Sequence, residues 1–338
     1  MIHNLMMNST KNLMMYNSID KIKYVNIETV NGCNYKCNIC HFWKNELNKL
    51  NFEKFKEIMD FIPTVLDEKI LFIFAGGEPL LHDRICDMIK LCKQKSISPF
   101  LATNGSLINK KLAQDLVNSG LGIIVISVDS YKKEIHEKIR GIKGSYDKVL
   151  NSLNIFSKIK EKNKNFKIGI VCTINAQNIS TIPKTVEFLQ KLGFIDYIEL
   201  QIISQIFQTT PIPNWYKDKR YSYLWPKDKK VVIKIYDELI KLKQNKSIIS
   251  NSINQLKMHK DYFLEKIINQ KKIICKINTA LRISTKGDII MCGQKSPLLS
   301  SNSKSFNFKS LVSKLYSEQN LMNKCKTNCH DNINAVYN

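Results

Sequence analysis

The sequence predicts an α/β protein in which a parallel sheet curls into a partial (β/α)6 TIM-like barrel, followed by a small C-terminal region. Strand-like apolar runs alternate with amphipathic helical segments six times in succession, which is typical of βα units. The run 69–75 is almost continuously apolar, as expected for a strand buried on both faces. The chain has 338 residues, and we expect one large domain plus a smaller one.

Local signals mark the individual elements. Asn51 is a suitable N-cap for a helix that ends before Pro63, and the apolar run 69–75 ends in a Gly-Gly-Glu-Pro turn. The expected strands are Tyr24–Val30, Lys69–Ala75, Pro99–Ala102, Leu121–Val128, Phe166–Ile174 and Tyr197–Ile203. The expected helices are 51–62, 83–95, 110–118, 132–140, 146–160 and 182–192, with two more at 227–243 and 253–269.

We divide the chain into four parts: an N-terminal extension (1–21), the barrel core (22–204), a linker with an aromatic loop and helices (205–270), and a C-terminal region (271–338). The aromatic loop carries Pro, Trp and Tyr at irregular spacing, which fits either a substrate-covering loop or a packed connection. In the C-terminal region, apolar stretches around Gly287 predict a β-hairpin whose turn needs this glycine.

Composition restricts the class of protein. The chain has 52 Lys and Arg against 29 Asp and Glu, a net charge of +23, which raises the question of nucleic-acid binding. The lysines are scattered and cluster mainly beside amphipathic helices, so we interpret them as solvated faces and do not expect a nucleic-acid partner. No apolar run approaches the roughly 18 residues of a membrane span, and no export signal is evident. We therefore expect a cytoplasmic protein, where thiols stay reduced.

Three thiols follow the first predicted strand, at Cys33, Cys37 and Cys40. The segment between the outer two spans at most about 25 Å when extended, so it can curl around a compact metal centre. A cubane iron-sulfur cluster normally takes four protein ligands, and a site with three leaves one iron open to a small molecule. The alternatives are a zinc site, for which His41 is the only local additional ligand, or three buried cysteines.

The C-x3-C-x2-C spacing, followed one βα unit later by the Gly-Gly-Glu-Pro turn, resembles the radical S-adenosylmethionine (SAM) superfamily. The resemblance implies a [4Fe-4S] cluster on Cys33, Cys37 and Cys40 that binds SAM and splits it into methionine and a 5′-deoxyadenosyl radical, which abstracts a hydrogen atom from the substrate. It also implies an electron donor such as flavodoxin or ferredoxin. Ile39 departs from the aromatic residue usual before the third cysteine, and the sequence identifies no catalytic acid or base.

The resemblance also implies SAM contacts. The predicted SAM-binding residues are Gly76, Gly77, Glu78, Pro79, Ser127, Asp129 and Arg140. Glu78 is matched in charge to the cofactor ammonium, Ser127 to a ribose hydroxyl and Arg140 to the carboxylate. For Arg140, a salt bridge with Glu137 or Asp147 is the structural alternative.

Polar residues share one face at the ends of the last three predicted barrel strands. Period-two alternation pairs Ser127 with Asp129, Thr173 with Asn175, and Glu199 with Gln201. For any single residue, a turn or cap role is as good an explanation as ligand contact. As a set, they indicate a polar pocket at the edge where such barrels bind their substrates.

A second group of cysteines lies near the C-terminus. The spacing C-x11-G-x4-C resembles the opening of the SPASM auxiliary-cluster domain of radical SAM enzymes, but only two further cysteines follow. The pattern is therefore similar to the shortened twitch domain, with one auxiliary [4Fe-4S] cluster, and structural zinc is the alternative. The predicted ligands are Cys275, Cys292, Cys325 and Cys329.

These observations together predict a radical SAM enzyme that acts on a small polar substrate such as a sugar or cyclitol, oxidised with the help of the auxiliary cluster. The alternative within the class is peptide or protein modification, as in peptide natural-product and sulfatase maturation. Only about twenty residues precede the first strand, too few for the peptide-docking domain of many peptide modifiers. A zinc-dependent interaction or nucleic-acid-binding protein is the alternative of another class.

Overall fold

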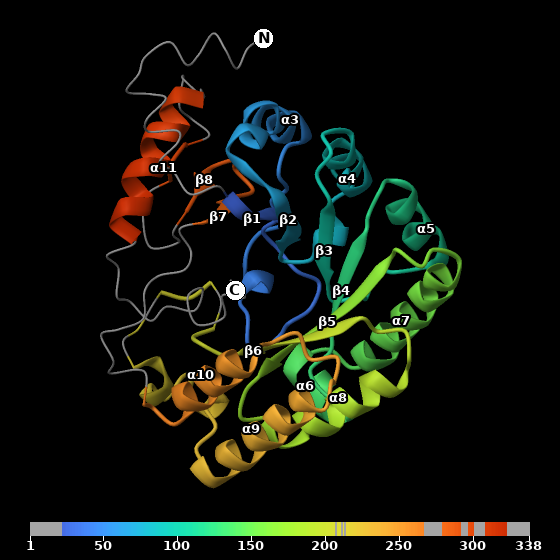
Figure 1. Cartoon of the computed structure of the whole chain (residues 1–338), viewed down its shortest axis with the longest axis vertical. Helices are drawn as coiled ribbons and strands as arrows, with labels where there is room; N and C mark the ends of the chain where they lie inside the picture. Colours follow the sequence, from blue (N-terminus) through green and yellow to red (C-terminus); the bar gives the residue numbers. More distant parts are fainter. Residues whose placement is uncertain are drawn as a thin grey trace.

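The computed structural model describes residues 22–206, 208–210, 212, 214–266, 279–291, 297–300 and 308–322. Its strands form one sheet in the order β6-β5-β4-β3-β2-β1-β7-β8. All neighbouring strands are parallel except β7 and β8, which form an antiparallel hairpin. Figure 1 shows β1 to β6 fanning out with helices along one side of the sheet. The predicted α/β fold with an open, partial barrel is confirmed.

The described elements follow the predicted order, with small shifts at their ends. The strands are β1 (Ile22–Val30), β2 (Leu66–Gly76), β3 (Pro99–Thr103), β4 (Ile123–Ser127), β5 (Lys167–Ile174), β6 (Tyr197–Ile202), β7 (Ala280–Ile283) and β8 (Ile289–Ile290). The α-helices are α3 (Phe52–Phe61), α4 (Ile85–Gln94), α5 (Lys110–Asn118), α6 (Lys133–Arg140), α7 (Ser145–Lys162), α8 (Ile182–Lys191), α9 (Lys229–Gln244), α10 (Ile253–Phe263) and α11 (Phe308–Met322). The short 3-10 helices are η1 (Phe42–Lys44), η2 (Ile62–Val65), η3 (Pro79–Leu81), η4 (Ile179–Thr181), η5 (Trp215–Lys217) and η6 (Ser222–Leu224).

Side-chain caps fix several helix starts. Asn51 accepts a hydrogen bond from the backbone N–H of Lys54, as its predicted N-cap role requires. Asn109 caps α5 in the same way, and Asp228 caps α9. These local signals explain why the sequence places α3 correctly. Helix α10 ends at Phe263 and is therefore shorter than the predicted helix, 253–269.

The two faces of the sheet differ in character, as β6 illustrates. Ile198, Leu200 and Ile202 are fully buried against the helices that cover one face. The alternate residues, Tyr197, Glu199 and Gln201, are half-buried on the other face, which we call the inner face. The core therefore lies between sheet and helices, and the inner face carries polar groups.

The C-terminal hairpin extends the barrel sheet. Strand β7 pairs in parallel with β1, where Tyr24 lies opposite Ala280 and Ile27 opposite Ile283. Its turn uses Gly287 at φ +85°, as predicted. The four predicted auxiliary-cluster ligands, Cys275, Cys292, Cys325 and Cys329, lie outside the described residues. Among the described helices, none has the length and apolar character required to cross a bilayer.

Candidate functional site

The cysteine loop, residues 31–50, connects β1 to α3 at the C-terminal edge of the sheet. The loop is closed at its base by two backbone hydrogen bonds. Asn31 N–H donates to the carbonyl of Asn48 (2.8 Å), and Leu50 N–H donates to the carbonyl of Thr29 (2.9 Å). The loop therefore folds back on itself instead of extending away from the sheet, which keeps its three thiols at the barrel edge.

The three thiols influence one another. Burial, together with a smaller contribution from the neighbouring Cys37 thiol, raises the pKa of Cys33 to about 11 and that of Cys40 to about 12. Burial also raises the pKa of Cys37. The backbone N–H of Tyr35 donates to Cys33 Sγ (3.4 Å), and the side-chain amide of Asn104 approaches the same sulfur (3.9 Å). Three adjacent thiols that would repel as anions need a positive centre to ionise together.

The donor set fits an iron-sulfur cluster. All three candidate ligands are thiols, the ligand type that such clusters use, and hydrogen-bond donors already point at Cys33 and Cys37. Within the described ranges, no three His, Cys, Asp or Glu side chains converge as they would on a single ion. The assignment of Cys33, Cys37 and Cys40 as cluster ligands stays a prediction that rests on their shared loop.

Asn38 fixes the middle of the cysteine loop, between the second and third thiols. Its backbone N–H donates to the carbonyl of Ile139 (3.0 Å) at the end of α6. Its side-chain Nδ2 donates to the carbonyl of Lys138 (3.3 Å) and to Oε1 of Gln177 (3.1 Å). The carbonyl of Asn38 accepts a hydrogen bond from Tyr223 Oη (3.2 Å). Segments far apart in the sequence thus hold the loop against the barrel.

The Gly-Gly-Glu-Pro turn lies directly against the cysteine loop. Gly77 N–H donates to the carbonyl of Val30 (2.9 Å), and Glu78 N–H donates to that of Gly32 (3.0 Å). A Cβ atom on Gly77 would lie 1.7 Å from the carbonyl oxygen of Gly32, so only glycine permits this approach. Gly76 adopts φ +111°, which other residues rarely do. The turn therefore fixes the position of the cysteine loop relative to the end of β2.

Glu78 is fully buried beneath this turn, and neighbouring donors occupy its carboxylate. Thr103 Oγ1 donates to Oε1 (2.7 Å), the backbone N–H of Asn104 donates to Oε2 (2.8 Å), and the N–H of Leu80 also donates to Oε1 (3.2 Å). Burial raises the pKa of Glu78, and these hydrogen bonds oppose that shift. Through these hydrogen bonds, Glu78 connects the end of β3 to the start of η3. Its predicted contact with a cofactor ammonium stays a prediction, as do those of Gly76, Gly77 and Pro79.

Asp129 and Arg140 form a buried ion pair behind the cysteine loop. Arg140 Nε lies 2.7 Å from Asp129 Oδ2, and Arg140 Nη1 points at Cys37 Sγ (4.0 Å). Burial alone would lower the pKa of Arg140, but Asp129 and Cys37 raise it above its usual value. Asp129 Oδ1 also accepts a hydrogen bond from the backbone N–H of Thr173 (3.2 Å). A permanent cation therefore stands beside the second thiol.

The alternative salt bridges considered for Arg140 are not formed. Asp147 pairs with Lys133, and Glu137 Oε1 accepts a hydrogen bond from the backbone N–H of Gly144 (2.8 Å). The observed partner of Arg140, Asp129, lies just after the preceding strand β4 and not on the helix, so residue spacing along α6 does not reveal it. The predicted contacts of Arg140 and Asp129 with SAM stay predictions, and both would act from behind the loop.

The inner face of the sheet carries the polar set expected from the strand ends. Ser127, Thr173, Glu199 and Gln201 are half-buried there. Gln201 Nε2 donates to Glu199 Oε1 (2.9 Å), and burial raises the pKa of Glu199 while this hydrogen bond lowers it. No cation among the described residues pairs with Glu199. Asn175, in contrast, is fully buried and serves the turn after β5.

The aromatic loop of the linker packs mainly as a connection. Tyr216 stacks on Trp225 with ring centroids 4.4 Å apart, and Trp225 packs edge-on against Phe263 at 5.2 Å. Trp215 Nε1 donates to Tyr262 Oη (3.3 Å). These rings are buried against α10. Of the two interpretations offered by the sequence, the packed connection fits these five residues.

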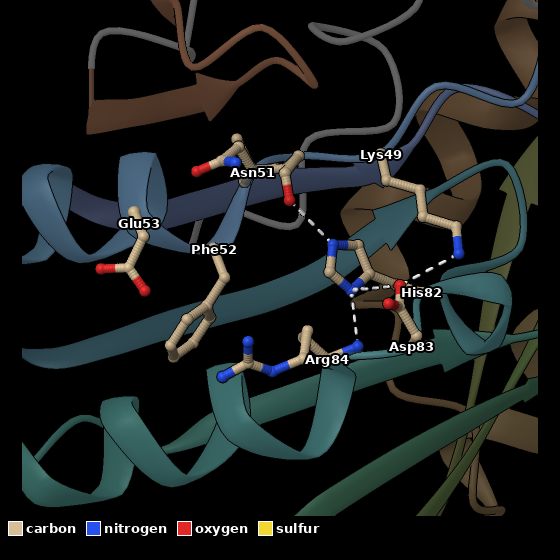
Figure 2. Close-up of a pocket in the computed structure, with 8 residues that line it drawn as sticks. Lys49, Asn51, Phe52, Glu53, His82, Asp83 and Arg84 are labelled. Atoms are coloured by element: carbon tan, nitrogen blue, oxygen red, sulfur yellow. Dashed lines mark hydrogen bonds and ion pairs between the residues drawn. The ribbon is translucent and has the colours of Figure 1, made fainter.

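A pocket of about 320 Å³ lies apart from the cysteines, between the starts of α3 and α4. Figure 2 shows His82 at its centre, flanked by Asp83 and Arg84. His82 Nε2 contacts the carbonyl of Leu50 (2.8 Å), and its Nδ1 accepts a hydrogen bond from the N–H of Arg84 (3.0 Å). None of the eight residues drawn there is a predicted site residue. Since both ring nitrogens of His82 are occupied, we regard this residue as structural.

Sequence reasoning missed the residues that hold the loop. Asn38, Gln177 and Tyr223 carry no local signal, because their hydrogen bonds join segments more than a hundred residues apart. Asn104 had a signal, since it belongs to the polar stretch after β3. It donates to Asn34 Oδ1 (2.9 Å) and thereby contacts the loop near the first thiol.

A search of protein families matches residues 27–189 to the radical SAM superfamily. Similar curated proteins include the Fe-coproporphyrin III synthase of Methanosarcina barkeri, which is 29% identical over 52% of this chain and 42% of its own length. Another is the GTP 3′,8-cyclase of Aliarcobacter butzleri, 30% identical over 52% of this chain and 54% of its own length. The chain thus spans about half the length of these relatives.

Solved structures share the fold more completely. The structure of native anSMEcpe with bound AdoMet (another name for SAM) and the Cp18Cys peptide has a TM-score of 0.66 at 19% identity, covering 90% of this chain and 84% of that one. Streptococcus suis SuiB bound to the precursor peptide SuiA has a TM-score of 0.65 at 16% identity, covering 93% and 70%. At these identities, the similarity establishes the fold.

Proposed function

Residues 27–189 of this chain are a radical SAM domain, and from that premise we propose that Cys33, Cys37 and Cys40 hold a [4Fe-4S] cluster that binds and reductively cleaves SAM. Proteins of this superfamily use such a cluster together with SAM. The observation that carries the proposal is the placement of three mutually interacting thiols in one closed loop at the C-terminal edge of a parallel barrel. When bound, the cluster would supply the electron that splits SAM into methionine and a 5′-deoxyadenosyl radical.

The surrounding residues would hold and insulate the ligands. The buried Arg140 cation beside Cys37 favours the thiolate form that binds iron. Burial of Cys37, which is 7% exposed, limits the access of water to that ligand. The close approach of Gly77 to the backbone of Gly32 fixes the cysteine loop relative to β2. The three ligands would therefore keep the same positions relative to the sheet.

The substrate would bind at the inner face of the sheet. Glu199 and Gln201 are half-buried there beside Thr173, and the Glu199 carboxyl accepts only one described hydrogen bond, from Gln201. A carboxyl in this setting is suited to bind a hydroxyl or amine of the substrate. This feature supports a small polar substrate such as a sugar or cyclitol. Two of the solved neighbours hold bound peptides, which supports peptide modification as the second candidate.

The test is anaerobic reconstitution with iron and sulfide, followed by measurement of 5′-deoxyadenosine formed from SAM with dithionite as reductant. We expect Cys33→Ala, Cys37→Ala and Cys40→Ala each to abolish 5′-deoxyadenosine formation. The matched control is Cys86→Ala, because Cys86 is a half-buried cysteine on α4, outside the cysteine loop. Unchanged 5′-deoxyadenosine formation by Cys37→Ala would overturn the assignment, and a colourless protein with bound zinc would favour the zinc-protein alternative.

The same preparation tests the proposed auxiliary cluster. A [4Fe-4S] cluster contains four irons by definition, so we expect the reconstituted wild type to bind about twice the iron of a variant that lacks the four C-terminal cysteines. Equal iron content in the two proteins would remove the twitch-type cluster from the proposal. SAM cleavage by the variant should persist, because the first three cysteines are intact.

A further inference from the structure

The C-terminal hairpin contributes a guanidinium to the barrel sheet. In β7, Leu281 and Ile283 belong to the hydrophobic core, and Arg282 between them is half-buried. Successive side chains of a strand point to opposite faces of the sheet, so Arg282 lies on the face opposite to these two core residues. This cation appears in no described helix cap, turn or core contact.

The pairing of β7 with β1 identifies this face as the inner face and places Arg282 near Glu28. Arg282 lies opposite Asn26, and Ile283 lies opposite Ile27. Along β1, Ile27 is buried in the core, whereas Asn26 and Glu28 on either side of it are exposed and half-buried. Glu28 and Arg282 are therefore diagonal neighbours on the same face of two adjacent strands.

The hairpin that carries Arg282 is held firmly. A Cβ on Gly287 in its turn would lie 2.7 Å from Cγ of Lys54 on α3, so the turn packs directly against that helix. After the turn, the backbone N–H of Ile289 donates to the carbonyl of Leu299 (2.8 Å). The position of Arg282 is thus fixed by β1 on one side and by α3 at the turn.

Glu28 and Arg282 influence each other without pairing. A Cβ on Gly76 would lie 3.1 Å from Glu28 Cγ, so the Glu28 side chain lies beside the Gly-Gly-Glu-Pro turn. Burial raises the pKa of Glu28, and the charge of Arg282 opposes that shift. Within the described ranges, neither side chain forms a hydrogen bond or a salt bridge. Two half-buried charged groups without a protein partner are suited to a ligand with complementary groups.

The same interior holds Glu199 on β6. In the order of the sheet, four strands separate β1 from β6. Nevertheless, burial and, to a smaller extent, the carboxyl of Glu199 raise the pKa of Tyr24 on β1. Because the effect of a charge falls with distance, the inner faces of β1 and β6 approach each other across the curled sheet. Arg282 and Glu28 therefore border the face at which we place the substrate.

From this arrangement, which rests on the proposed function, we propose that Arg282 and Glu28 select a substrate that carries an oxyanion. Arg282 binds the carboxylate or phosphate group, and Glu28 accepts a hydrogen bond from a neighbouring hydroxyl or amine. A guanidinium presents its N–H donors in a fixed fork that matches two oxygens of such a group. A neutral sugar or cyclitol would leave Arg282 unpaired, so the substrate class narrows to sugar acids or sugar phosphates.

The test uses three sugars with the same ring: glucuronate, glucose 6-phosphate and glucose. They carry a carboxylate, a phosphate and no charge. Dissociation constants are measured by calorimetry on the reconstituted full chain with SAM and without reductant, so that no turnover occurs. Arg282→Gln removes the guanidinium. Lys286→Gln is the matched control, because it removes the same charge from the turn of the same hairpin, where Lys286 is exposed and has no described salt bridge.

We expect the wild type and Lys286→Gln to bind at least one of the two sugar anions about tenfold or more tightly than glucose, as charged hydrogen bonds would give. In Arg282→Gln, this preference should disappear. The sugar anion that shows the larger preference distinguishes a carboxylate from a phosphate as the group that Arg282 binds. Glu28→Ala should weaken the binding of charged and neutral sugars alike, because it removes a hydroxyl contact that they share.

A wild type that binds neither sugar anion more tightly than glucose, or that binds none of the three sugars, would overturn the proposal. An anion preference that persists in Arg282→Gln would overturn it too, and sugar binding unchanged by Glu28→Ala would remove the second half of the pair.

Two further measurements exclude other roles for Arg282. A lower denaturant midpoint of unfolding for Arg282→Gln than for Lys286→Gln would make the guanidinium a structural group of the hairpin and would contradict substrate selection. A loss of SAM affinity in Arg282→Gln would assign the guanidinium to the cofactor, with the same consequence. If the wild type forms no 5′-deoxyadenosine, the proposed function fails, and the sugar measurement, which needs no SAM cleavage, still decides what Arg282 binds.

Discussion

At the scale of single residues, the cysteine loop is held in place by a glycine that has no side chain and by a buried ion pair. Gly77 carries no Cβ, and this absence lets two backbone segments meet where any side chain would collide with Gly32. The buried Arg140 shows a complementary effect, because its charge is tolerated only through Asp129 and the adjacent thiol. Both residues hold the cysteine loop in place, and neither supplies one of its thiols.

We predict that Gly77→Ala displaces the cysteine loop. The added methyl carbon would lie 1.7 Å from the carbonyl oxygen of Gly32 and 2.4 Å from its carbonyl carbon, so the backbone must move. We expect the variant to lose on the order of 2–4 kcal/mol of unfolding free energy and most of its reconstituted iron, measured by denaturant unfolding and iron analysis.

Gly122→Ala is the matched control for this substitution. A Cβ at Gly122 meets nothing within 4 Å, so the same chemical change adds no clash there. Its iron content should equal that of the wild type. If Gly77→Ala retained full iron and stability, the close approach of the two backbones would not determine the position of the loop.

Sequence reasoning succeeded at residues with local signals and failed at those without. The thiols, the glycine turn and the Asn51 cap are read from their immediate neighbours in the chain. The partner of Arg140 could not be read in this way, because Asp129 precedes α6 and reaches Arg140 only after the strand-to-helix turn has formed. Asn38 and Tyr223 are 185 residues apart, and no local pattern connects them.

At the scale of elements, charged hydrogen bonds join the helices to the sheet. Asp196, which precedes β6, pairs with Lys160 on α7 and with Lys167 at the start of β5. Its Oδ2 also accepts a hydrogen bond from the backbone N–H of Ile168 (2.7 Å). Burial alone would raise the pKa of Asp196, but Lys160 and the other donors lower it below its usual value.

We predict that Asp196→Asn destabilises the protein at neutral pH by about 1–3 kcal/mol, the range for charged hydrogen bonds. The folded-state pKa of Asp196 is depressed, so its ionised form stabilises the fold above the ordinary aspartate pKa. That contribution declines as the pH falls through the depressed value. Denaturant unfolding of both proteins across acidic pH should show the stability difference shrinking as the carboxylate protonates.

Glu161→Gln is the control, because Glu161 is an exposed acid on the same helix end as Lys160 and has no described salt bridge. It should leave the unfolding free energy within about 0.5 kcal/mol of the wild type. A pH-independent effect of Asp196→Asn would mean that the carboxylate charge does not join α7 to the sheet.

At the scale of the whole molecule, the alternation of strands and helices predicted the barrel, because each βα unit is encoded within its own segment. The pairing of β7 with β1 was not predicted, since no sequence pattern specifies which edge of a sheet a distant hairpin will join. This pairing places residues 280–283 of the C-terminal region against the first barrel strand. The edge of β1 is thereby covered, which removes an exposed strand edge.

Our central proposal for the whole molecule is that Cys33, Cys37 and Cys40 bind a cluster and leave one iron free for SAM. The most direct measurement is electron-nuclear double resonance on the reduced, reconstituted protein with SAM labelled with ¹⁵N at its amino group. We expect a hyperfine coupling from this nitrogen and an altered paramagnetic spectrum on SAM addition. An unaltered spectrum without nitrogen coupling would contradict the claim.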